Sequence, residues 1–112
     1  MAEKQKMLIC GATGFIGRNL LERYCHDEKY SVRAVYNIKP ALEQYNVEWV
    51  HADLNNIKDV RRVLQDIDIV LQFAATTSGA NDIINRPHIH VTDNAVMNSL
   101  ILRECYEQHI KH

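Results

Sequence analysis

The chain has 112 residues, of which 46% are hydrophobic and 24% are charged, with a formal net charge of -1. This composition is typical of one folded domain that is large enough to bury a core. A nearly neutral chain carries no electrostatic footprint for nucleic acid or for an anionic membrane surface, so we predict neither as a partner. Its apolar runs are far shorter than the ~20 residues that a membrane span needs.

The cysteines and the first residues indicate the compartment. Cys10, Cys25 and Cys105 are odd in number, widely spaced and set among apolar neighbours. We interpret them as reduced core cysteines. Residues 1–6 lead straight into a strand-like segment, which leaves no room for a signal peptide. We therefore predict a cytoplasmic protein.

The first predicted strand covers residues 7–10 (MLIC), a short and uniformly apolar run typical of a strand that is buried on both faces. It is followed at 11–17 by GATGFIG, which holds three of the four glycines of the chain. Apolar residues then recur at helical spacing and predict an amphipathic helix. Its predicted apolar face consists of Ile16, Leu20, Leu21 and Tyr24.

Three strands and two helices are predicted in the rest of the chain. Two of the strands lie at 32–36 and 47–51. Either Asn55 or Asn56 can cap the helix that follows. The predicted apolar face of that helix is Ile57, Val60, Val63, Leu64 and Ile67. Residues 68–75 form a fourth, almost wholly apolar strand, and a long helix runs from about 92 to 109. On this last helix, the predicted shared face is Leu102, Cys105 and Tyr106.

Strands that alternate with helices predict an α/β fold, a Rossmann-type doubly wound parallel sheet with helices on both sides. The expected strand order is 3-2-1-4. The fourth strand is too apolar for a comfortable sheet edge, and the last helix should lead into a fifth strand. We therefore expect the sheet to be truncated after the fourth strand and its helix, so that the chain is the N-terminal part of a longer enzyme.

The glycine segment has the features of a phosphate cradle. Gly11 permits a tight turn, Gly14 lets a pyrophosphate approach the backbone, and Gly17 lets the helix pack closely on the sheet. The free N–H groups near Phe15 and Ile16, at the positive end of the helix dipole, can hold the anion. The alternative is a glycine-rich turn without a ligand, but the strand before it and the helix after it favour the ligand. A P-loop is excluded because no Gly-Lys-Ser/Thr follows.

The Gly-x-x-Gly-x-x-Gly spacing differs from that of ordinary dehydrogenases. It resembles the extended short-chain dehydrogenases/reductases, which form the NAD-dependent epimerase/dehydratase family. Four segments carry this resemblance across essentially the whole chain, in the order and spacing of the family. They are GATGFIG (11–17), ADL (52–54), DIVLQFAA (68–75) and VTDNAVMNSL (91–100).

The resemblance implies that residues 1–112 are the N-terminal part of an NAD(P)-binding Rossmann domain, with the rest of that domain and a substrate lobe absent. Residues 13–17 would bind the pyrophosphate, the Asp53 carboxylate would accept from the amine of adenine, and 74–76 would lie near the nicotinamide ribose. The implied cofactor-binding residues so far are Gly11, Thr13, Gly14, Phe15, Ile16, Gly17, Asp53, Leu54, Ala74, Ala75, Thr76 and Asn94. Each also has a plain structural interpretation. Asp53 could end a strand, the alanines could pack, and Asn94 could cap a helix.

The second predicted strand departs from the family pattern. NAD-preferring relatives close it with an acidic residue that binds the ribose 2′-hydroxyl. That position is Tyr36 here, and Asn37 and Lys39 follow it. We add these three residues to the predicted site. Because no carboxylate here repels a 2′-phosphate and Lys39 is close by, the site permits NADP as well as NAD. We predict NAD or NADP as the cofactor and favour NADP.

Two further departures leave the substrate class open. Gln72 stands where the family often has histidine, and Met97 stands where it often has glycine.

No catalytic residue is predicted within the chain. The family relies on a Tyr-x-x-x-Lys pair for proton transfer, and none of the five tyrosines has lysine four residues later. We expect the pair beyond residue 112 and predict that this stretch alone is inactive. No metal site is predicted either, because His88-x-His90 and His109-x-x-His112 lack a Cys or carboxylate set at ligand spacing.

The resemblance implies an NAD(P)-dependent sugar-nucleotide epimerase, dehydratase or reductase that transfers hydride at a sugar carbon. This chain would supply the dinucleotide-binding half, and the sugar nucleotide would bind mainly to the absent C-terminal part. The family also implies a homodimer formed through helices that include the one around Asn94. The alternative is a non-catalytic NAD(P)-binding regulator, a redox sensor with the same fold.

Overall fold

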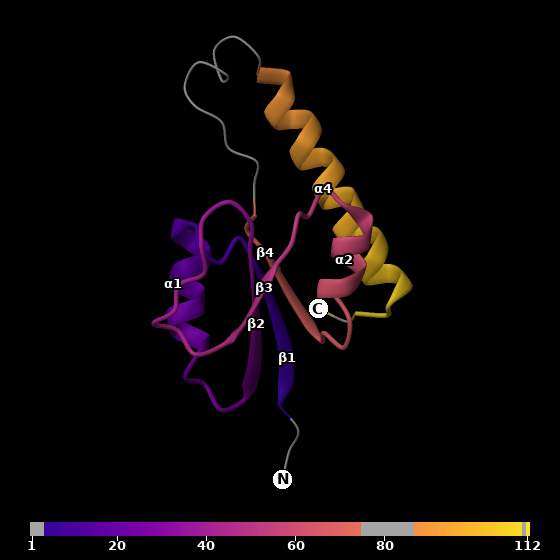
Figure 1. The fold of residues 1–112 in the computed structure, drawn as a ribbon. Helices are drawn as coiled ribbons and strands as arrows, with labels where there is room; N and C mark the ends of the chain where they lie inside the picture. The colour runs from indigo at the N-terminus through magenta and orange to yellow at the C-terminus, as the bar shows by residue number, and fades with distance from the viewer. Residues whose placement is uncertain (1–3, 75–86, 111) are drawn as a thin grey trace.

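The computed structural model describes residues 4–74, 87–110 and 112, and for 87–94 the backbone alone. Four parallel strands form one sheet in the order β3-β2-β1-β4, which confirms the predicted fold class and strand order (Figure 1). Helix α1 covers one face of this sheet, and helices α2 and α4 cover the other. The elements are β1 (Gln5–Cys10), α1 (Phe15–Tyr24), β2 (Tyr30–Tyr36), β3 (Glu48–His51), α2 (Ile57–Val63), β4 (Ile69–Gln72) and α4 (Pro87–Glu107).

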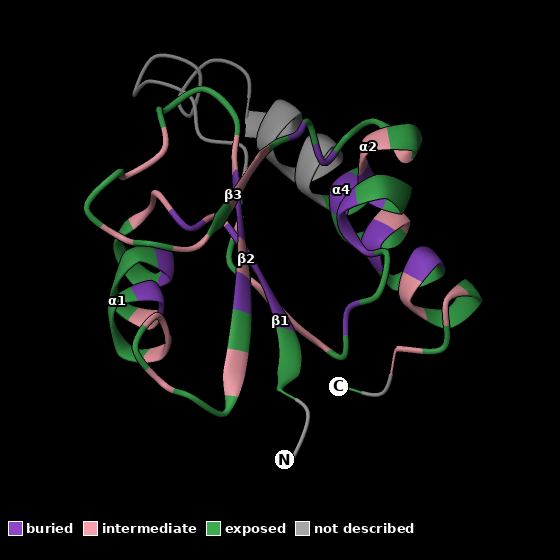
Figure 2. Cartoon of the chain, turned by 60° about the horizontal axis from the view of Figure 1, so that its bottom comes forward, coloured by how far each residue is buried: buried purple, intermediate pink, exposed green. Residues whose placement is uncertain are grey.

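Strand β1 is the centre of the core. Its residues from Met7 to Cys10 are each at most 3% exposed. Successive side chains of a strand point to opposite faces. Accordingly, Met7 and Ile9 belong to the apolar cluster beneath α1, whereas Leu8 and Cys10 belong to the cluster beneath α2 and α4. Figure 2 shows the buried residues along β1 and on the inner sides of the helices. A uniformly apolar strand is therefore buried on both faces, as predicted.

Helix α1 turns a slightly different face to the sheet than its periodicity predicts. Gly17 and Leu21 are its buried residues, with Leu20 and Tyr24 packed beside them. Ile16 is 54% exposed, so its assignment to the apolar face is wrong. The inner position of the first turn is taken by Gly17, and its neighbour Ile16 lies about 100° around the helix axis.

Helix α2 resolves the choice between the two asparagines. Asn56 is the N-cap, and its side-chain oxygen accepts from the backbone N–H groups of Lys58, at 2.9 Å, and Asp59, at 3.4 Å. The helix ends at Val63, so Leu64 and Ile67 lie in the turn after it, although both are buried as predicted.

The buried face of α4 differs from the prediction. Met97, Ile101 and Glu104 are at most 4% exposed, whereas Leu102 is 70% and Tyr106 is 81% exposed. These three residues share a face of the helix as predicted, but that face is not the buried one, and only Cys105 on it is half-buried. The sequence of this helix has apolar residues on nearly every side, so its periodicity does not single out one face. The helix also begins at Pro87 instead of about residue 92 and ends two residues early.

A polar contact joins α4 to α2. The buried Glu104 carboxylate accepts from Arg61 Nε at 3.0 Å and from Gln108 Nε2 at 3.4 Å. Gln108 Nε2 also lies 3.3 Å from the Arg61 carbonyl oxygen. A buried carboxylate needs such partners because an unpaired charge in a core is costly. The site where α4 lies on α2 is thus defined by this contact as well as by apolar packing.

Strand β4 is at the edge of the sheet and is shorter than the predicted 68–75. After α4 the chain returns to this strand, where the Val70 N–H donates to the His112 carbonyl oxygen at 2.7 Å. The last described residue therefore lies beside the open edge of β4.

All three cysteines are free, but only Cys10 is fully buried. Cys25 is half-buried at the end of α1, which corrects its assignment to the core. Burial raises the pKa of the Cys10 thiol to about 12. Cys10 therefore stays protonated near neutral pH and acts as a small apolar residue.

Candidate functional site

The turn between β1 and α1 depends on Gly11. This residue has φ +78°, a conformation that side chains other than glycine rarely adopt. A Cβ on Gly11 would lie 2.6 Å from backbone atoms of Phe73 and Ala74, where the chain leaves β4. Gly11 therefore permits both the turn and the close approach of the segment that follows β4.

Gly17 brings α1 against that turn. A Cβ on Gly17 would overlap the Gly11 carbonyl oxygen and would lie 2.7 Å from the Gly11 carbonyl carbon. The close packing is thus with the backbone of the turn, and not with the strands of the sheet. The start of α1 is held directly above the end of β1.

Gly14 differs from the other two glycines because its missing side chain leaves open space. A Cβ there would have one neighbour within 4 Å, the Gly11 carbonyl oxygen at 3.4 Å, which is an ordinary contact. Gly14 is the N-cap of α1, its N–H donates to Gly11 at 3.1 Å, and its carbonyl oxygen accepts from Arg18 at 2.8 Å. The backbone at Gly14 can therefore be approached by an outside group.

The first turn of α1 presents donors and no negative charge. The N–H groups of Phe15, Ile16 and Gly17 have no carbonyl partner within the helix, because they lie in its first turn. That turn holds no acidic residue. The side chains of Phe15 and Ile16 are exposed. Free N–H groups at the positive end of a helix dipole suit an anion.

The end of β4 lies beside the same turn. Gln72 pairs with Cys10 in the register of the sheet, and Phe73 N–H donates to the Cys10 carbonyl oxygen at 3.0 Å. The Gln72 amide accepts from Ala74 N–H at 3.1 Å and donates to Asn98 Oδ1 at 3.1 Å. Gln72 therefore orders the backbone at Ala74 and connects it to α4.

Some predicted site residues lie outside the described structure. Ala75 and Thr76 are not among the described residues, and the side chain of Asn94 is not described. His88 and His90, considered above as metal ligands, have no described side chains either. Among the side chains that are described, no group of three or more His, Cys, Asp or Glu could hold a metal ion.

Tyr36 closes β2 beside two aromatic neighbours on β3. Its ring centroid lies 5.3 Å from that of His51 and 6.2 Å from that of Trp49. His51 is directly opposite Tyr36 in the sheet. Asn37 and Lys39 follow in an exposed loop. Sequence reasoning missed His51, because only the strand register brings it to Tyr36.

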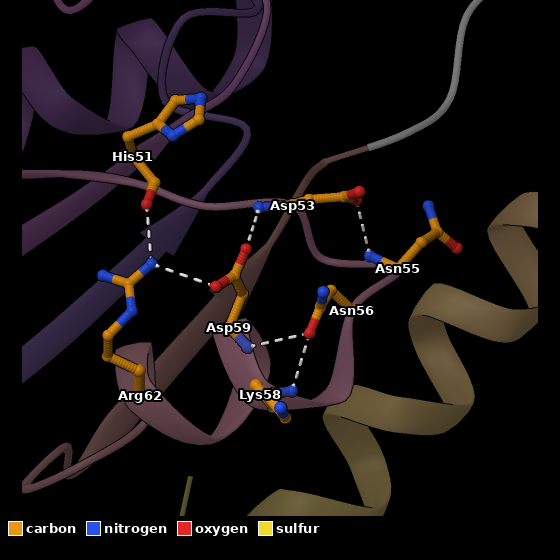
Figure 3. A network of polar contacts seen from close by, with 7 residues as sticks. All are labelled: His51, Asp53, Asn55, Asn56, Lys58, Asp59 and Arg62. Atoms are coloured by element: carbon orange, nitrogen blue, oxygen red, sulfur yellow. Dashed lines mark hydrogen bonds and ion pairs between the residues drawn. The ribbon is translucent and has the colours of Figure 1, made fainter.

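Asp53 lies just past the end of β3, between two buried residues. Ala52 is 1% and Leu54 is 5% exposed, whereas Asp53 is exposed. Its Oδ1 accepts from Asn55 N–H at 2.9 Å, and its own N–H donates to Asp59 Oδ2 at 2.9 Å (Figure 3). The Asp53 contact is the largest cause that lowers the pKa of Asp59, and Arg62 lowers it further. Asp59 was not a predicted site residue; its only sequence signal is an acidic residue three positions after a helix cap.

The parallel topology brings these separate segments together. The carboxyl ends of all four strands meet at one edge of the sheet, and open α/β sheets bind ligands at that edge. The turn at Gly11, the end of β2 at Tyr36, the loop at Asp53 and the segment after β4 at Ala74 all lie there.

The comparisons with known proteins agree with this arrangement. The model of the family described as NAD dependent epimerase/dehydratase matches residues 7–112. No helix of the described residues is long and apolar enough to cross a membrane. No curated protein matches the chain at a significant level.

Several solved structures are similar to the chain. One is a UDP-glucuronic acid 4-epimerase mutant from Bacillus cereus in complex with UDP-4-deoxy-4-fluoro-glucuronic acid and NAD, at 28% identity and TM-score 0.73 over 96% of this chain and 37% of that chain. A UDP-N-acetylglucosamine 4-epimerase from Bacillus cereus has 23% identity and TM-score 0.74, over 96% of this chain and 36% of that one. A UDP-glucose 4-epimerase from Thermotoga maritima has 19% identity and TM-score 0.80, over the same shares, 96% and 36%. The chain thus spans about a third of the length of the structures it matches.

Proposed function

The chain belongs to the NAD dependent epimerase/dehydratase family, and on that premise we propose that its glycine loop binds the pyrophosphate of NAD or NADP. The observation that supports this most is the geometry of the loop. Gly11 and Gly17 have no room for a side chain, whereas the space at Gly14 is open beside the free N–H groups of α1. A bound dinucleotide accounts for an open glycine there.

We propose that the predicted site residues contact successive parts of such a dinucleotide, of which Ala75, Thr76 and the side chain of Asn94 lie outside the described structure. Residues 13–17 would hold the pyrophosphate, and Tyr36, Asn37 and Lys39 would lie at the adenosine ribose. Asp53 and Leu54 would lie at the adenine, and residues 74–76, with Asn94, at the nicotinamide end. When bound, the nicotinamide supplies an acceptor that takes up hydride and can return it.

We favour NADP over NAD on the evidence of Tyr36. An acidic residue at the end of β2 would repel a 2′-phosphate, and Tyr36 with its neighbours His51 and Trp49 carries no negative charge there. Lys39 lies in the exposed loop that follows. These groups therefore do not repel the 2′-phosphate of NADP, and Lys39 can attract it.

The proposed reaction is hydride transfer at a carbon of a sugar nucleotide, in an epimerase, dehydratase or reductase. The structure of the Bacillus cereus UDP-glucuronic acid 4-epimerase that resembles this chain contains both NAD and a UDP-sugar. The 112 residues contain no Tyr-x-x-x-Lys pair. Our proposal is therefore that they bind the dinucleotide and do not catalyse the transfer alone. A non-catalytic sensor, the alternative, has no observation of its own in its favour.

We also propose that the protein forms a homodimer through α4. Leu102 and Tyr106 are one turn apart on this helix, and both are exposed large apolar side chains. Such a pair on the outer side of a helix suits contact with a second copy.

The variant Gly14→Val tests dinucleotide binding. Its side chain would occupy the space that the pyrophosphate needs, and the backbone at Gly14, with φ -81°, can hold a valine. We expect binding of NAD and NADP, measured by isothermal titration calorimetry, to fall by at least ~100-fold, the equivalent of about 3 kcal/mol. The far-ultraviolet circular dichroism spectrum should stay unchanged.

The matched control is Asn19→Val, an equal side chain at an exposed position of the same helix. It should keep the affinity of the unchanged protein. Equal affinity of Gly14→Val and the unchanged protein would show that the glycine loop serves the fold alone.

A further inference from the structure

The loop after β3 leaves the sheet at Ala52. Its N–H makes the last contact with β2, to the Tyr36 carbonyl oxygen at 3.0 Å. Ala52 and Leu54 are buried in the core, so the residue between them, Asp53, is held outward. Beyond Ala52, however, the sheet no longer supplies a partner for the backbone N–H of Asp53.

Asp59 supplies that partner from α2. Its Oδ2 accepts from the Asp53 N–H at 2.9 Å. Asp59 is the third residue of the helix, and an acidic side chain at this position commonly reaches back to the N–H of the capping residue. Here it reaches three residues farther, past Asn56, to the loop itself.

Arg62 fixes Asp59 and the end of β3 together. One of its terminal nitrogens lies 3.3 Å from Asp59 Oδ1 and donates to the His51 carbonyl oxygen at 2.7 Å. The two side chains therefore hold the backbone on both sides of Ala52 (Figure 3). The pKa of Asp59 is lowered, so its carboxylate remains charged and able to accept.

With its backbone held, the Asp53 carboxylate has a defined direction. Its Oδ1 accepts from Asn55 N–H at 2.9 Å, and its carbonyl oxygen accepts from Asn56 N–H at 3.0 Å. Among the described residues, its hydrogen bonds within the loop use Oδ1, which leaves Oδ2 for an outside donor. The exocyclic amine of adenine is such a donor.

We propose that Asp59 is a positioning residue which, through the backbone of Asp53, sets the preference of the site for adenine over other bases. This inference rests on the proposed function. Without the Asp59 contact, the 52–55 turn would rotate about its two buried anchors, and the Asp53 carboxylate would lose its alignment. The preference would then fall although the cofactor still binds through its pyrophosphate.

The test compares two dinucleotides that differ at the six-position of the base and at the neighbouring ring nitrogen N1, which carries a hydrogen only in the hypoxanthine form. Nicotinamide hypoxanthine dinucleotide has a carbonyl oxygen where NAD has the exocyclic amine. A hydrogen bond to a carboxylate is worth roughly 10-fold to 100-fold in affinity, so we expect the unchanged 112-residue protein to prefer NAD by about that ratio. In Asp59→Ala we expect the ratio to fall to within about 3-fold of unity, with the affinity for the hypoxanthine form little changed.

Three further variants separate positioning from stability. Asp59→Asn keeps an oxygen that can accept from Asp53 N–H and should restore most of the ratio. Asp59→Ser is for use if Asp59→Ala does not fold. Its side chain is too short to reach Asp53, so the ratio should fall as it does in Asp59→Ala. Lys58→Ala, at the exposed neighbouring position, should leave the ratio unchanged.

An unchanged ratio in folded Asp59→Ala or Asp59→Ser would overturn this inference while the proposed function stands. If the affinity ratio in Asp59→Asn were as low as in Asp59→Ala, the hydrogen bond from Asp53 N–H to residue 59 would not be the cause of the preference. Absence of binding of either dinucleotide by the unchanged protein would overturn the proposed function and this inference with it.

Discussion

At the scale of single residues, the three glycines of the loop have three different physical roles. Gly11 adopts a left-handed backbone conformation, Gly17 has no room for a Cβ, and Gly14 borders open space. Their spacing predicts that some of them permit close approach, but only the structure shows which backbone each approaches. For Gly17 this is the Gly11 carbonyl group, a contact that no sequence pattern names.

Gly17→Ala tests the close contact of α1 with the turn. Alanine favours a helix by ~1 kcal/mol over glycine, but here its Cβ would overlap the Gly11 carbonyl oxygen. We expect the overlap to dominate and to lower the free energy of unfolding by about 1–3 kcal/mol, measured by urea denaturation. Asn19→Ala, exposed on the same helix, is the control and should be neutral or stabilising. A Gly17→Ala protein as stable as that control would contradict the close contact.

At the scale of elements, α4 ends in a turn that the sequence does not reveal. The Ile110 N–H donates to the Cys105 carbonyl oxygen at 2.9 Å, and the His109 N–H donates to Tyr106 at 3.2 Å. His109 has φ 58°. These are the contacts of a Schellman motif, in which glycine usually holds the left-handed position. Ile110 then packs against the core cluster, so the turn directs the chain back to the sheet.

His109→Gly should therefore stabilise the protein. It relieves the left-handed conformation of a side-chain-bearing residue, which costs about 1–2 kcal/mol, against a smaller loss from the more flexible unfolded chain. We expect the free energy of unfolding to rise by about 0.5–1 kcal/mol, measured by urea denaturation. His109→Ala keeps a Cβ in the same conformation and should show no such gain. Equal effects of the two variants would contradict this explanation.

At the scale of the whole molecule, α1 covers one face of the sheet, and α2 and α4 cover the other. The outer side of α4 exposes a pair of large apolar residues. Leu102 and Tyr106 belong to neither core cluster. Sequence periodicity places them on one face of the helix, and the fold turns that face outward, because α4 meets α2 through Glu104 and its partners Arg61 and Gln108. The outer position supports the proposed homodimer.

Leu102→Glu tests this interface. A buried charge without a partner would disfavour association, whereas at an exposed position of a monomer it costs little. By light scattering after size-exclusion chromatography, we expect the unchanged protein at twice its 13.0 kDa chain mass and the variant at 13.0 kDa. Ile38→Glu, an exposed apolar residue in the loop after β2, should leave the dimer intact. An unchanged protein of 13.0 kDa would contradict a dimer.

The sequence by itself determined the features that depend on local patterns. A uniformly apolar β1 must be buried on both faces, alternating strands and helices must form a parallel sheet, and the glycine spacing must mark a turn before a helix. The fold class, the strand order and the position of Tyr36 at the end of β2 follow from these patterns.

The tertiary structure alone decided which groups meet. It selected Asn56 over Asn55 as the cap, placed His51 beside Tyr36, and joined Asp59 to Asp53. It also turned Ile16 and Leu102 outward. The physical reason is that the burial and the hydrogen bonds of a side chain depend on the element that packs against it. Periodicity describes one element, whereas the partner comes from another element that the chain reaches only by folding.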